Sequence, residues 1–228
     1  MRLLVSPRDV AEAKRSSAAD IIDVKRPAEG SLGANFPWVI RAVRNVSERP
    51  VSAAIGDFDF RPGGAALAAY GAAHAGADYI KIGLMFAGSE KAEEVIEAVV
   101  KAVKDEFPEK YVVIAAYSDH ERLGTISPFA MSPIAAAAGA DVAMVDTGIK
   151  DGKSTFDFMD EVALLKFTTM NRKSGLQTAL AGALRFDHLP SLRRINPDII
   201  GVRGMVCGGN RNATIQEDLV LRLARMVG

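Results

Sequence analysis

Short apolar runs alternate with amphipathic segments along the whole chain. The amphipathic segments have helical spacing, as in Ala92–Val103, where apolar residues recur every three or four positions. Ser127-Pro128 and Ser6-Pro7-Arg8-Asp9 each have the capping serine and the proline that are typical of a helix start. The apolar runs are rich in Val, Ile or Ala and have the length of strands: Leu3–Val5, Asp20–Lys25, Val51–Ile55, Tyr79–Gly83, Tyr111–Ala115, Val142–Asp146, Thr178–Ala181 and Ile199–Arg203.

Eight strand–helix units in 228 residues predict an α/β fold, a (β/α)8 TIM barrel, whose usual size is about 250 residues. A doubly wound open sheet is the alternative. Residues 1–228 are predicted to form one domain, since no linker or low-complexity tract divides the chain. Glycine and proline cluster in Pro27–Pro37 and Arg61–Gly64, which we expect to be loops over the active face.

An internal repeat favours the barrel. An aspartate precedes four of the predicted strands, at Asp20, Asp78, Asp141 and Asp198, with intervals of 58, 63 and 57 residues. Each interval holds two strand–helix units, so these strands are numbers 2, 4, 6 and 8. Positions three and five residues after each aspartate share one face of the strand. They hold Asp23 and Lys25, Lys81 and Gly83, Met144 and Asp146, Gly201 and Arg203. In a barrel, this face points inward at the catalytic end.

Charge and composition exclude several classes of partner. Positive and negative side chains balance at 28 each, which favours neither a nucleic acid nor an anionic membrane surface as a partner. No apolar stretch approaches the ~18 residues of a membrane span, and the start lacks the apolar core of an export signal. The single cysteine, Cys207, cannot form an internal disulfide. We therefore expect a cytoplasmic protein without metal or cofactor, and the sequence is compatible with a homo-oligomer.

Two lysines are the leading candidates for chemistry. Lys25 and Lys81 lie on alternate predicted strands and point into the barrel. Burial and a neighbouring cation both lower the pKa of a lysine, which leaves a free amine that can attack a carbonyl. The alternative is a pair of structural ion pairs, Lys25 with Asp23 and Lys81 with Asp146.

Asp146 is the candidate acid or base, or the residue that orients the amine. Lys150 follows four residues later, in a loop that could close over an anionic substrate, although this segment could also be a solvated turn. Either Lys150 or Ser31 could hold a phosphate group. His120, after the fifth strand, could also approach the site, while Phe36 and Trp38 are expected to anchor the second helix.

Glycines after the last two strands indicate a second phosphate site. TIM barrels often bind phosphate at backbone amides in this region, and this chain has Gly182 after strand 7, with Gly201 and Gly204 around strand 8. Arg203 adds a forked donor that matches a phosphate. Glycine after a barrel strand is also common for turn geometry alone.

The stretch from Asp23 to Trp38, DVKRPAEGSLGANFPW, resembles a known family. It is similar to the (5-formylfuran-3-yl)methyl phosphate synthases, the 4-HFC-phosphate synthases of methanofuran biosynthesis. The similarity extends nearly from end to end. Further matches are Leu3–Pro7, Tyr79–Gly83, Asp146-Thr147, Ile149–Lys153 and Gly201–Gly204.

The resemblance implies a TIM barrel that acts like a class I aldolase, a lyase without a metal. Two molecules of glyceraldehyde 3-phosphate, a small phosphorylated triose, would condense, cyclise and lose water and one phosphate. The family's Schiff-base lysine falls on Lys25 and its proton-transferring lysine on Lys81. The acid and lysine of its strand 6 region fall on Asp146 and Lys150.

Two other functions remain open from the residues alone. One is a sugar-phosphate decarboxylase or epimerase that uses the Asp-x-Lys pair of Asp23 and Lys25 without an imine. The other is a non-catalytic barrel that binds a phosphorylated ligand. An imine trapped on the protein would favour the synthase over both.

Overall fold

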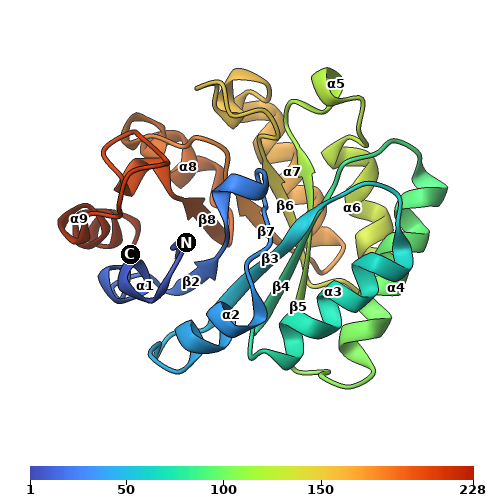
Figure 1. Ribbon diagram of the computed structural model, residues 1–228. Coiled ribbons are helices and arrows are strands. Elements are labelled where there is room, and N and C mark those ends of the chain that lie inside the picture. Colours follow the sequence, from blue (N-terminus) through green and yellow to red (C-terminus); the bar gives the residue numbers. More distant parts are fainter.

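The computed structural model describes residues 1–228 and shows a closed barrel of eight parallel strands in sequence order, surrounded by helices (Figure 1). The strands are β1 (Arg2–Val5), β2 (Ile21–Val24), β3 (Val51–Phe58), β4 (Tyr79–Leu84), β5 (Tyr111–Tyr117), β6 (Val142–Asp146), β7 (Gln177–Leu180) and β8 (Ile199–Val202). All eight predicted strands are therefore confirmed, and the open sheet is excluded because β1 pairs with β8.

Helices follow each strand and cover the outside of the barrel. The α-helices are α1 (Val10–Arg15), α2 (Pro37–Arg44), α3 (Pro62–His74), α4 (Ser89–Lys104), α5 (His120–Leu123), α6 (Pro128–Ala137), α7 (Glu161–Lys173), α8 (Leu189–Ile195) and α9 (Glu217–Val227). Short 3-10 helices are η1 (Pro27–Glu29), η2 (Thr155–Asp157), η3 (Phe186–His188) and η4 (Gly204–Val206). No helix has both the length and the apolar character that crossing a bilayer requires.

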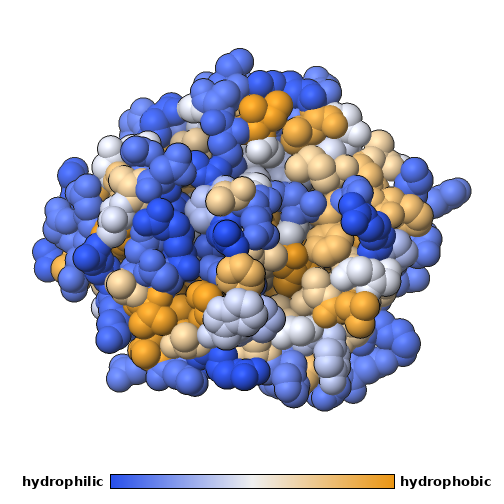
Figure 2. All heavy atoms as spheres, in the orientation of Figure 1, coloured by the Kyte–Doolittle hydropathy of each residue, from blue (hydrophilic) through white to orange (hydrophobic).

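Apolar side chains form two separate cores. The larger core lies between the strands and the helices, and the predicted apolar face of Ala92–Val103 is buried there as part of α4. The smaller core fills the barrel itself and includes Leu4, Ile21 and Met144. Charged side chains are mostly outside, and Figure 2 shows a largely hydrophilic face with small apolar groups scattered over it. The inner core forms the floor on which the polar residues at the strand ends rest.

The repeated aspartates join strands in pairs at the amino ends of the strands, opposite the end of the barrel that carries the polar residues. Each carboxylate accepts a hydrogen bond from the backbone amide at or near the start of the preceding strand. For Asp20, Asp78, Asp141 and Asp198 the donors are the amides of Leu3, Val51, Val112 and Thr178, at 2.7, 2.7, 2.7 and 2.8 Å. The carboxylates satisfy amides that the parallel ladder leaves unpaired at the strand starts. The repeat is therefore a structural device.

Several local predictions differ from the structure. Helix α1 begins at Val10 after the cap Asp9, three residues later than Ser6-Pro7 predicts, because Ser6 continues from β1 into the barrel. The Ser127-Pro128 start of α6 is confirmed. The loop predicted for Arg61–Gly64 is wrong, because α3 already begins at Pro62.

The aromatic pair at the start of α2, the N-cap Phe36 and Trp38 in the first turn, does not anchor the helix in the core. The rings of Phe36 and Trp38 stack on each other at 4.5 Å, and their side chains are 41% and 66% exposed. Buried Ile40 and Val43 instead attach α2 to the barrel.

Candidate active site

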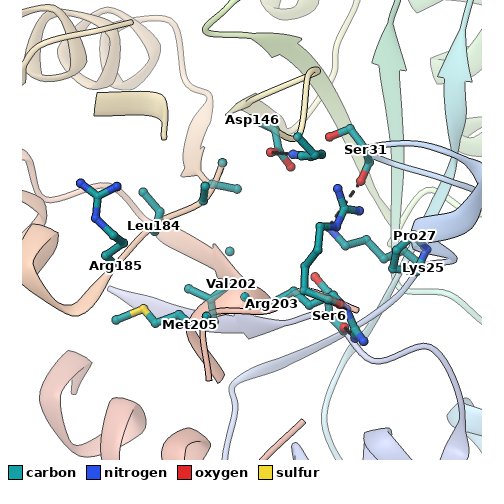
Figure 3. Close-up of a pocket in the computed structure, with 18 of the residues that line it drawn as sticks. Ser6, Lys25, Pro27, Ser31, Asp146, Leu184, Arg185, Val202, Arg203 and Met205 are labelled. Carbon is teal, nitrogen blue, oxygen red and sulfur yellow. Dashed lines mark hydrogen bonds and ion pairs between the residues drawn. The ribbon is translucent and has the colours of Figure 1, made fainter. Parts of the chain in front are cut away.

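A large pocket opens at the carboxyl ends of the strands (Figure 3). Its volume of about 990 Å³ is at the upper end of the range for small-molecule sites. Nine of the ten residues that the sequence predicts for the site line this pocket: Lys25, Ser31, Lys81, Asp146, Lys150, Gly182, Gly201, Arg203 and Gly204. The tenth, Asp23, is buried just beneath it.

Lys81 and Asp23 form a buried ion pair in the barrel floor. The ammonium group of Lys81 lies 2.8 Å from both carboxylate oxygens of Asp23, which also accept hydrogen bonds from Ser6 and Ser52 at 2.8 and 2.7 Å. Burial alone would raise the pKa of Asp23, but the charges of Lys81 and Lys25 and these hydrogen bonds outweigh it and lower the pKa. Asp23 is therefore an ionised anchor for Lys81.

A second ion pair, between Lys150 and Asp146, forms at the end of β6 and in the loop that follows it. The ammonium group of Lys150 donates to Asp146 Oδ1 at 2.7 Å and to the carbonyl and hydroxyl oxygens of Thr147 at 2.6 and 3.0 Å. Burial would raise the pKa of Asp146, but Lys150 and Lys25 together outweigh it and lower the pKa. The ion pairs considered from the sequence, Lys25 with Asp23 and Lys81 with Asp146, are thus not the pairs that form.

Lys25 has no carboxylate partner. It follows β2, its side chain is buried, and the only hydrogen bond of its ammonium group is a long one of 3.5 Å to the carbonyl of Ser31. Burial lowers the pKa of Lys25 to about 8; the charge of Asp146 opposes this shift and that of Lys81 adds to it. At pH 7 about one-tenth of such an amine is neutral, far more than for an exposed lysine. Lys25 has the properties of a nucleophilic amine.

The loop after β2 folds over Lys25 and is tied to the loop after β6. The hydroxyl of Ser31 donates to the carbonyl of Thr147 at 2.8 Å, and Thr147 in turn holds Lys150. A side chain at Gly33 would lie 2.2 Å from the carbonyl of Arg26, so the tight fold of this loop requires glycine there. Figure 3 shows Ser31 and Lys25 on one side of the pocket, with Arg185 on the other.

Arg203 lines the pocket, but its guanidinium is fully occupied by protein groups. It pairs with buried Glu12 at 2.8 Å and donates to the carbonyls of Ser6, Arg211 and Ala213 at 2.6, 2.6 and 3.2 Å. A second contact to Glu12, at 3.3 Å, takes the last of its five N–H groups. The predicted contact between Arg203 and phosphate would require one of these bonds to break.

The three glycines that the sequence predicts for phosphate binding lie in different parts of the pocket. Gly201 lies in the barrel floor, where a side chain would meet Ala181 at 3.2 Å. Gly182 has a φ of +91°, and a side chain there would lie 2.3 Å from the hydroxyl of Thr155. Gly204 begins η4 at the pocket wall. The backbone amides of Gly182 and Gly204 have no partner in the protein, so they are free to bind an anion.

Asp57 and Tyr117 lie outside the pocket lining but support the loop over Lys25, and neither was predicted from the sequence. Their side chains are hydrogen-bonded to each other, and Asp57 also accepts the amide of Leu32 at 3.1 Å, which fixes the loop over Lys25. Burial and the charge of Asp57 raise the pKa of Tyr117 well above its usual value. A side chain at Gly83 would lie 2.0 Å from the Tyr117 hydroxyl, so this glycine makes room for the pair.

The signal for Asp57 lies in a β-bulge. The register between β3 and β4 shifts between Ala54 and Gly56, which pairs Asp57 with Gly83 and turns it inward. Strict alternation from inward-facing Ala54 would turn Asp57 outward. Gly56 has a φ of +134°, and a glycine within a strand is a signal for such a bulge.

His120 and the single cysteine both lie outside the pocket lining. His120 begins α5 and does not line the pocket. Cys207 is buried behind the wall, and burial raises the pKa of its thiol, which makes it a poor nucleophile. No group of three or more His, Cys, Asp or Glu side chains has an arrangement that could hold a metal ion.

The closed barrel and the pocket at the carboxyl ends of its strands place the chain in the TIM-barrel class. The chain is similar in fold to KGPDC from Streptococcus mutans (TM-score 0.67, 14% identity) over 99% of this chain and 96% of the other. It is similar to 3-hexulose-6-phosphate synthase (TM-score 0.66, 20% identity) over 98% and 99%. At these identities the similarity shows the fold alone.

Within that class, the chain belongs to the 4-HFC-P synthase family, whose profile matches residues 3–224. It is 58% identical to the (5-formylfuran-3-yl)methyl phosphate synthase of Methanosarcina barkeri (strain Fusaro), over 98% of this chain and 97% of the relative. The synthase of the same name from Archaeoglobus fulgidus is 49% identical over 100% and 99%. The chain is therefore a synthase of this family.

Proposed function

We propose that the protein condenses two molecules of glyceraldehyde 3-phosphate into (5-formylfuran-3-yl)methyl phosphate, for the biosynthesis of a methanofuran-type cofactor. The product is the one that the names of the relatives state. The atoms balance when two trioses give one furan phosphate, one inorganic phosphate and two waters. No oxidant or reductant is needed. Dehydration to an aromatic ring supplies the driving force.

The state of Lys25 carries this proposal. Among the three lysines at the centre of the pocket, Lys81 and Lys150 are paired with carboxylates at 2.8 and 2.7 Å. Lys25 has no such partner, and its pKa of about 8 leaves a usable fraction of free amine near neutral pH. An amine in this state can add to an aldehyde and lose water to form an iminium ion.

The neighbouring pairs supply proton transfer. The iminium ion acidifies the adjacent carbon of the triose. Lys81, at the floor of the pocket, first passes a proton to the carboxylate of Asp23, to which it is hydrogen-bonded, and its neutral amine then takes the proton from that carbon. The resulting enamine carbon attacks the aldehyde of the second triose, and this bond joins the two carbon chains. Asp146 with Lys150 forms a separate pair that can donate a proton to the alkoxide formed in this step.

Each triose also brings a phosphate group that the pocket must hold. The free amides of Gly182 and Gly204 suit one phosphate. Ring closure, loss of water and release of the other phosphate complete the sequence. Ring closure adds an oxygen of the second triose to the imine carbon, and Lys25 leaves that carbon as the free amine when the ring becomes aromatic.

The decarboxylase or epimerase alternative would use Asp23 and Lys25 as one catalytic pair. In the structure Asp23 pairs with Lys81 rather than Lys25, and its carboxylate lies beneath the pocket. This geometry favours the imine mechanism.

Reductive trapping tests the proposal. The protein is incubated with glyceraldehyde 3-phosphate and borohydride, and the adduct is measured by intact mass and located by peptide mapping. We expect an adduct on Lys25, none in Lys25→Met, and an undiminished adduct in Lys153→Met, which removes an exposed lysine at the pocket mouth. Substrate consumption without an adduct would instead indicate chemistry without an imine. Binding without turnover would indicate a non-catalytic barrel.

A further inference from the structure

The positively charged groups that line the pocket differ in how far the protein satisfies them. The three N–H groups of Lys150 and the five of Arg203 are all used in hydrogen bonds to the protein. Lys81 is shared between the two oxygens of Asp23. Arg211 is the exception among the arginines of the pocket interior. Its guanidinium makes one hydrogen bond, a long one of 3.3 Å to the carbonyl of Gly30.

Arg211 is half-buried without a counter-ion. No carboxylate lies within 4 Å of its guanidinium, and burial lowers the pKa of the group despite the opposing charge of Asp146. A guanidinium stays ionised even so, because its ordinary pKa is above 12. A half-buried cation with four unused donors is costly unless an anion completes it.

The loop that carries Arg211 is fixed from behind. Arg203 Nε donates to the backbone carbonyl of Arg211 at 2.6 Å, and the Arg203 guanidinium is itself locked to Glu12. The neighbouring Gly208 and Gly209 also line the pocket, and they bring no side chain between Arg211 and the open volume. The structure thus separates two roles: Arg203 holds the loop, and Arg211 presents a forked donor to the pocket.

Arg211 stands on the same edge of the pocket as Lys25. Its single hydrogen bond goes to Gly30, and the next residue, Ser31, provides the carbonyl that lies 3.5 Å from the Lys25 ammonium. An anion on Arg211 would therefore lie beside the attacking amine.

We propose that Arg211 binds the phosphate group of the triose whose carbonyl reacts with Lys25. The planar guanidinium matches two phosphate oxygens with two parallel N–H donors. The bond to Gly30 breaks or shifts when the phosphate binds, which costs little because it is long. This assignment rests on the proposed function and gives the Lys25 substrate its own phosphate ligand, apart from the amides of Gly182 and Gly204.

The test compares a phosphorylated with an unphosphorylated aldehyde. Imine trapping at Lys25 is measured against concentration for glyceraldehyde 3-phosphate and for glyceraldehyde. In Arg211→Met we expect the half-saturating concentration of the phosphorylated aldehyde to rise about ten- to a hundredfold. This is the loss of affinity expected when one charge-assisted hydrogen-bonding contact is removed. The trapping of unphosphorylated glyceraldehyde should stay at the wild-type level. Arg211→Lys should recover part of the loss, since it restores charge but not the fork.

Arg185→Met is the matched control. Arg185 also lines the pocket, but it lies across from Lys25 and pairs with Asp187 at 3.4 Å (Figure 3). The proposal is overturned if Arg211→Met raises the half-saturating concentration of glyceraldehyde 3-phosphate no more than Arg185→Met does. It is also overturned if both aldehydes lose trapping equally, because Arg211 would then only position the Gly30 loop.

A binding measurement separates this proposal from the proposed function. If the wild type traps neither aldehyde, the imine mechanism fails, and calorimetry with glycerol 3-phosphate still tests Arg211. Weaker binding in Arg211→Met by at least tenfold would then support a phosphate ligand at this position. Equal binding in both proteins would refute it.

Discussion

The carboxylate of Asp23 accepts two hydrogen bonds of 2.8 Å from the ammonium group of Lys81, although Lys25 follows Asp23 by only two residues in the chain. This choice of partner determines the chemistry of the site. The end of β2 directs Lys25 upward into the pocket, while Lys81 reaches the carboxylate from β4. One lysine is thereby held as part of a pair, and the other is left as an amine without a counter-ion.

The rate of imine trapping should rise with pH, with a midpoint near 8. Only the neutral amine attacks, and burial lowers the pKa of Lys25 to about 8. The charge of Asp146 raises this pKa and that of Lys150 lowers it. Asp146→Asn should therefore shift the midpoint to lower pH, and Lys150→Met should shift it to higher pH. Trapping measured from pH 6 to 10 checks this, and shifts in the same direction for both variants would contradict it.

Removal of the Lys25 amine should stabilise the fold while it abolishes trapping. A buried cation whose pKa lies well below its unfolded value costs stability at neutral pH, on the order of 2–4 kcal/mol here. Below pH 8 both the folded and the unfolded chain carry the proton, so the full cost is present. Between pH 8 and about 10.5 the unfolded chain binds more protons, and the stability of the wild type rises with pH.

Urea unfolding of Lys25→Met beside the wild type measures this effect. The gain in the free energy of unfolding should be largest at pH 7 and should shrink toward pH 10. Lys153→Met is the control, because it removes an exposed lysine from the same pocket. A Lys25→Met protein that is less stable at pH 7 would show that the amine is better solvated than its burial indicates.

The Lys81–Asp23 pair should behave as one unit. Asp23→Asn leaves the buried ammonium of Lys81 without a counter-ion and should cost about 3–5 kcal/mol of unfolding free energy. The double variant Asp23→Asn/Lys81→Met should cost clearly less than the sum of the two single changes. For comparison, Lys101→Met breaks the exposed pair with Asp105 and should cost less than about 1 kcal/mol. Additive costs at the buried pair would mean that it contributes no coupling.

Much of the fold could be predicted because it depends on repeated local patterns. The apolar runs and the four aspartates place eight strands in the right order, and the inward positions after each aspartate do carry the lysines and acids of the pocket. The aspartates repeat because each closes a strand pair at the far end of the barrel, as Asp20 does with Leu3.

The partners within the site could not be predicted in the same way. The alternation of side chains along a strand indicates that Asp23, Lys25 and Lys81 face the barrel interior. It does not indicate which of them form ion pairs, because the pairing depends on the tilt of the strands and the length of the side chains. Likewise, Arg203 points to the site as expected, yet its guanidinium turns back to Glu12, a residue of α1 that is far away in the sequence. Such pairings arise only when the barrel closes.

The glycine of β4 should tolerate a side chain only when the Tyr117 hydroxyl is gone. A Cβ atom at Gly83 would lie 2.0 Å from that hydroxyl and 2.9 Å from Asp57 Oδ1, in a tightly packed interior. Gly83→Ala should therefore destabilise the fold by about 1–3 kcal/mol. It should also weaken imine trapping, since displacement of Asp57 releases the amide of Leu32 in the loop over Lys25.

Tyr117→Phe removes the atom that makes the closest contact, so the cost of Gly83→Ala should fall in this background. Thermal unfolding of the four proteins in this cycle gives the coupling between the two positions. Gly201→Ala is a suitable control, because its side chain would meet Ala181 at 3.2 Å in the barrel floor but touches neither Asp57 nor Tyr117. If Gly83→Ala lowered the unfolding free energy equally in the wild type and in Tyr117→Phe, the clash at this position would be with Asp57 rather than with the tyrosine hydroxyl.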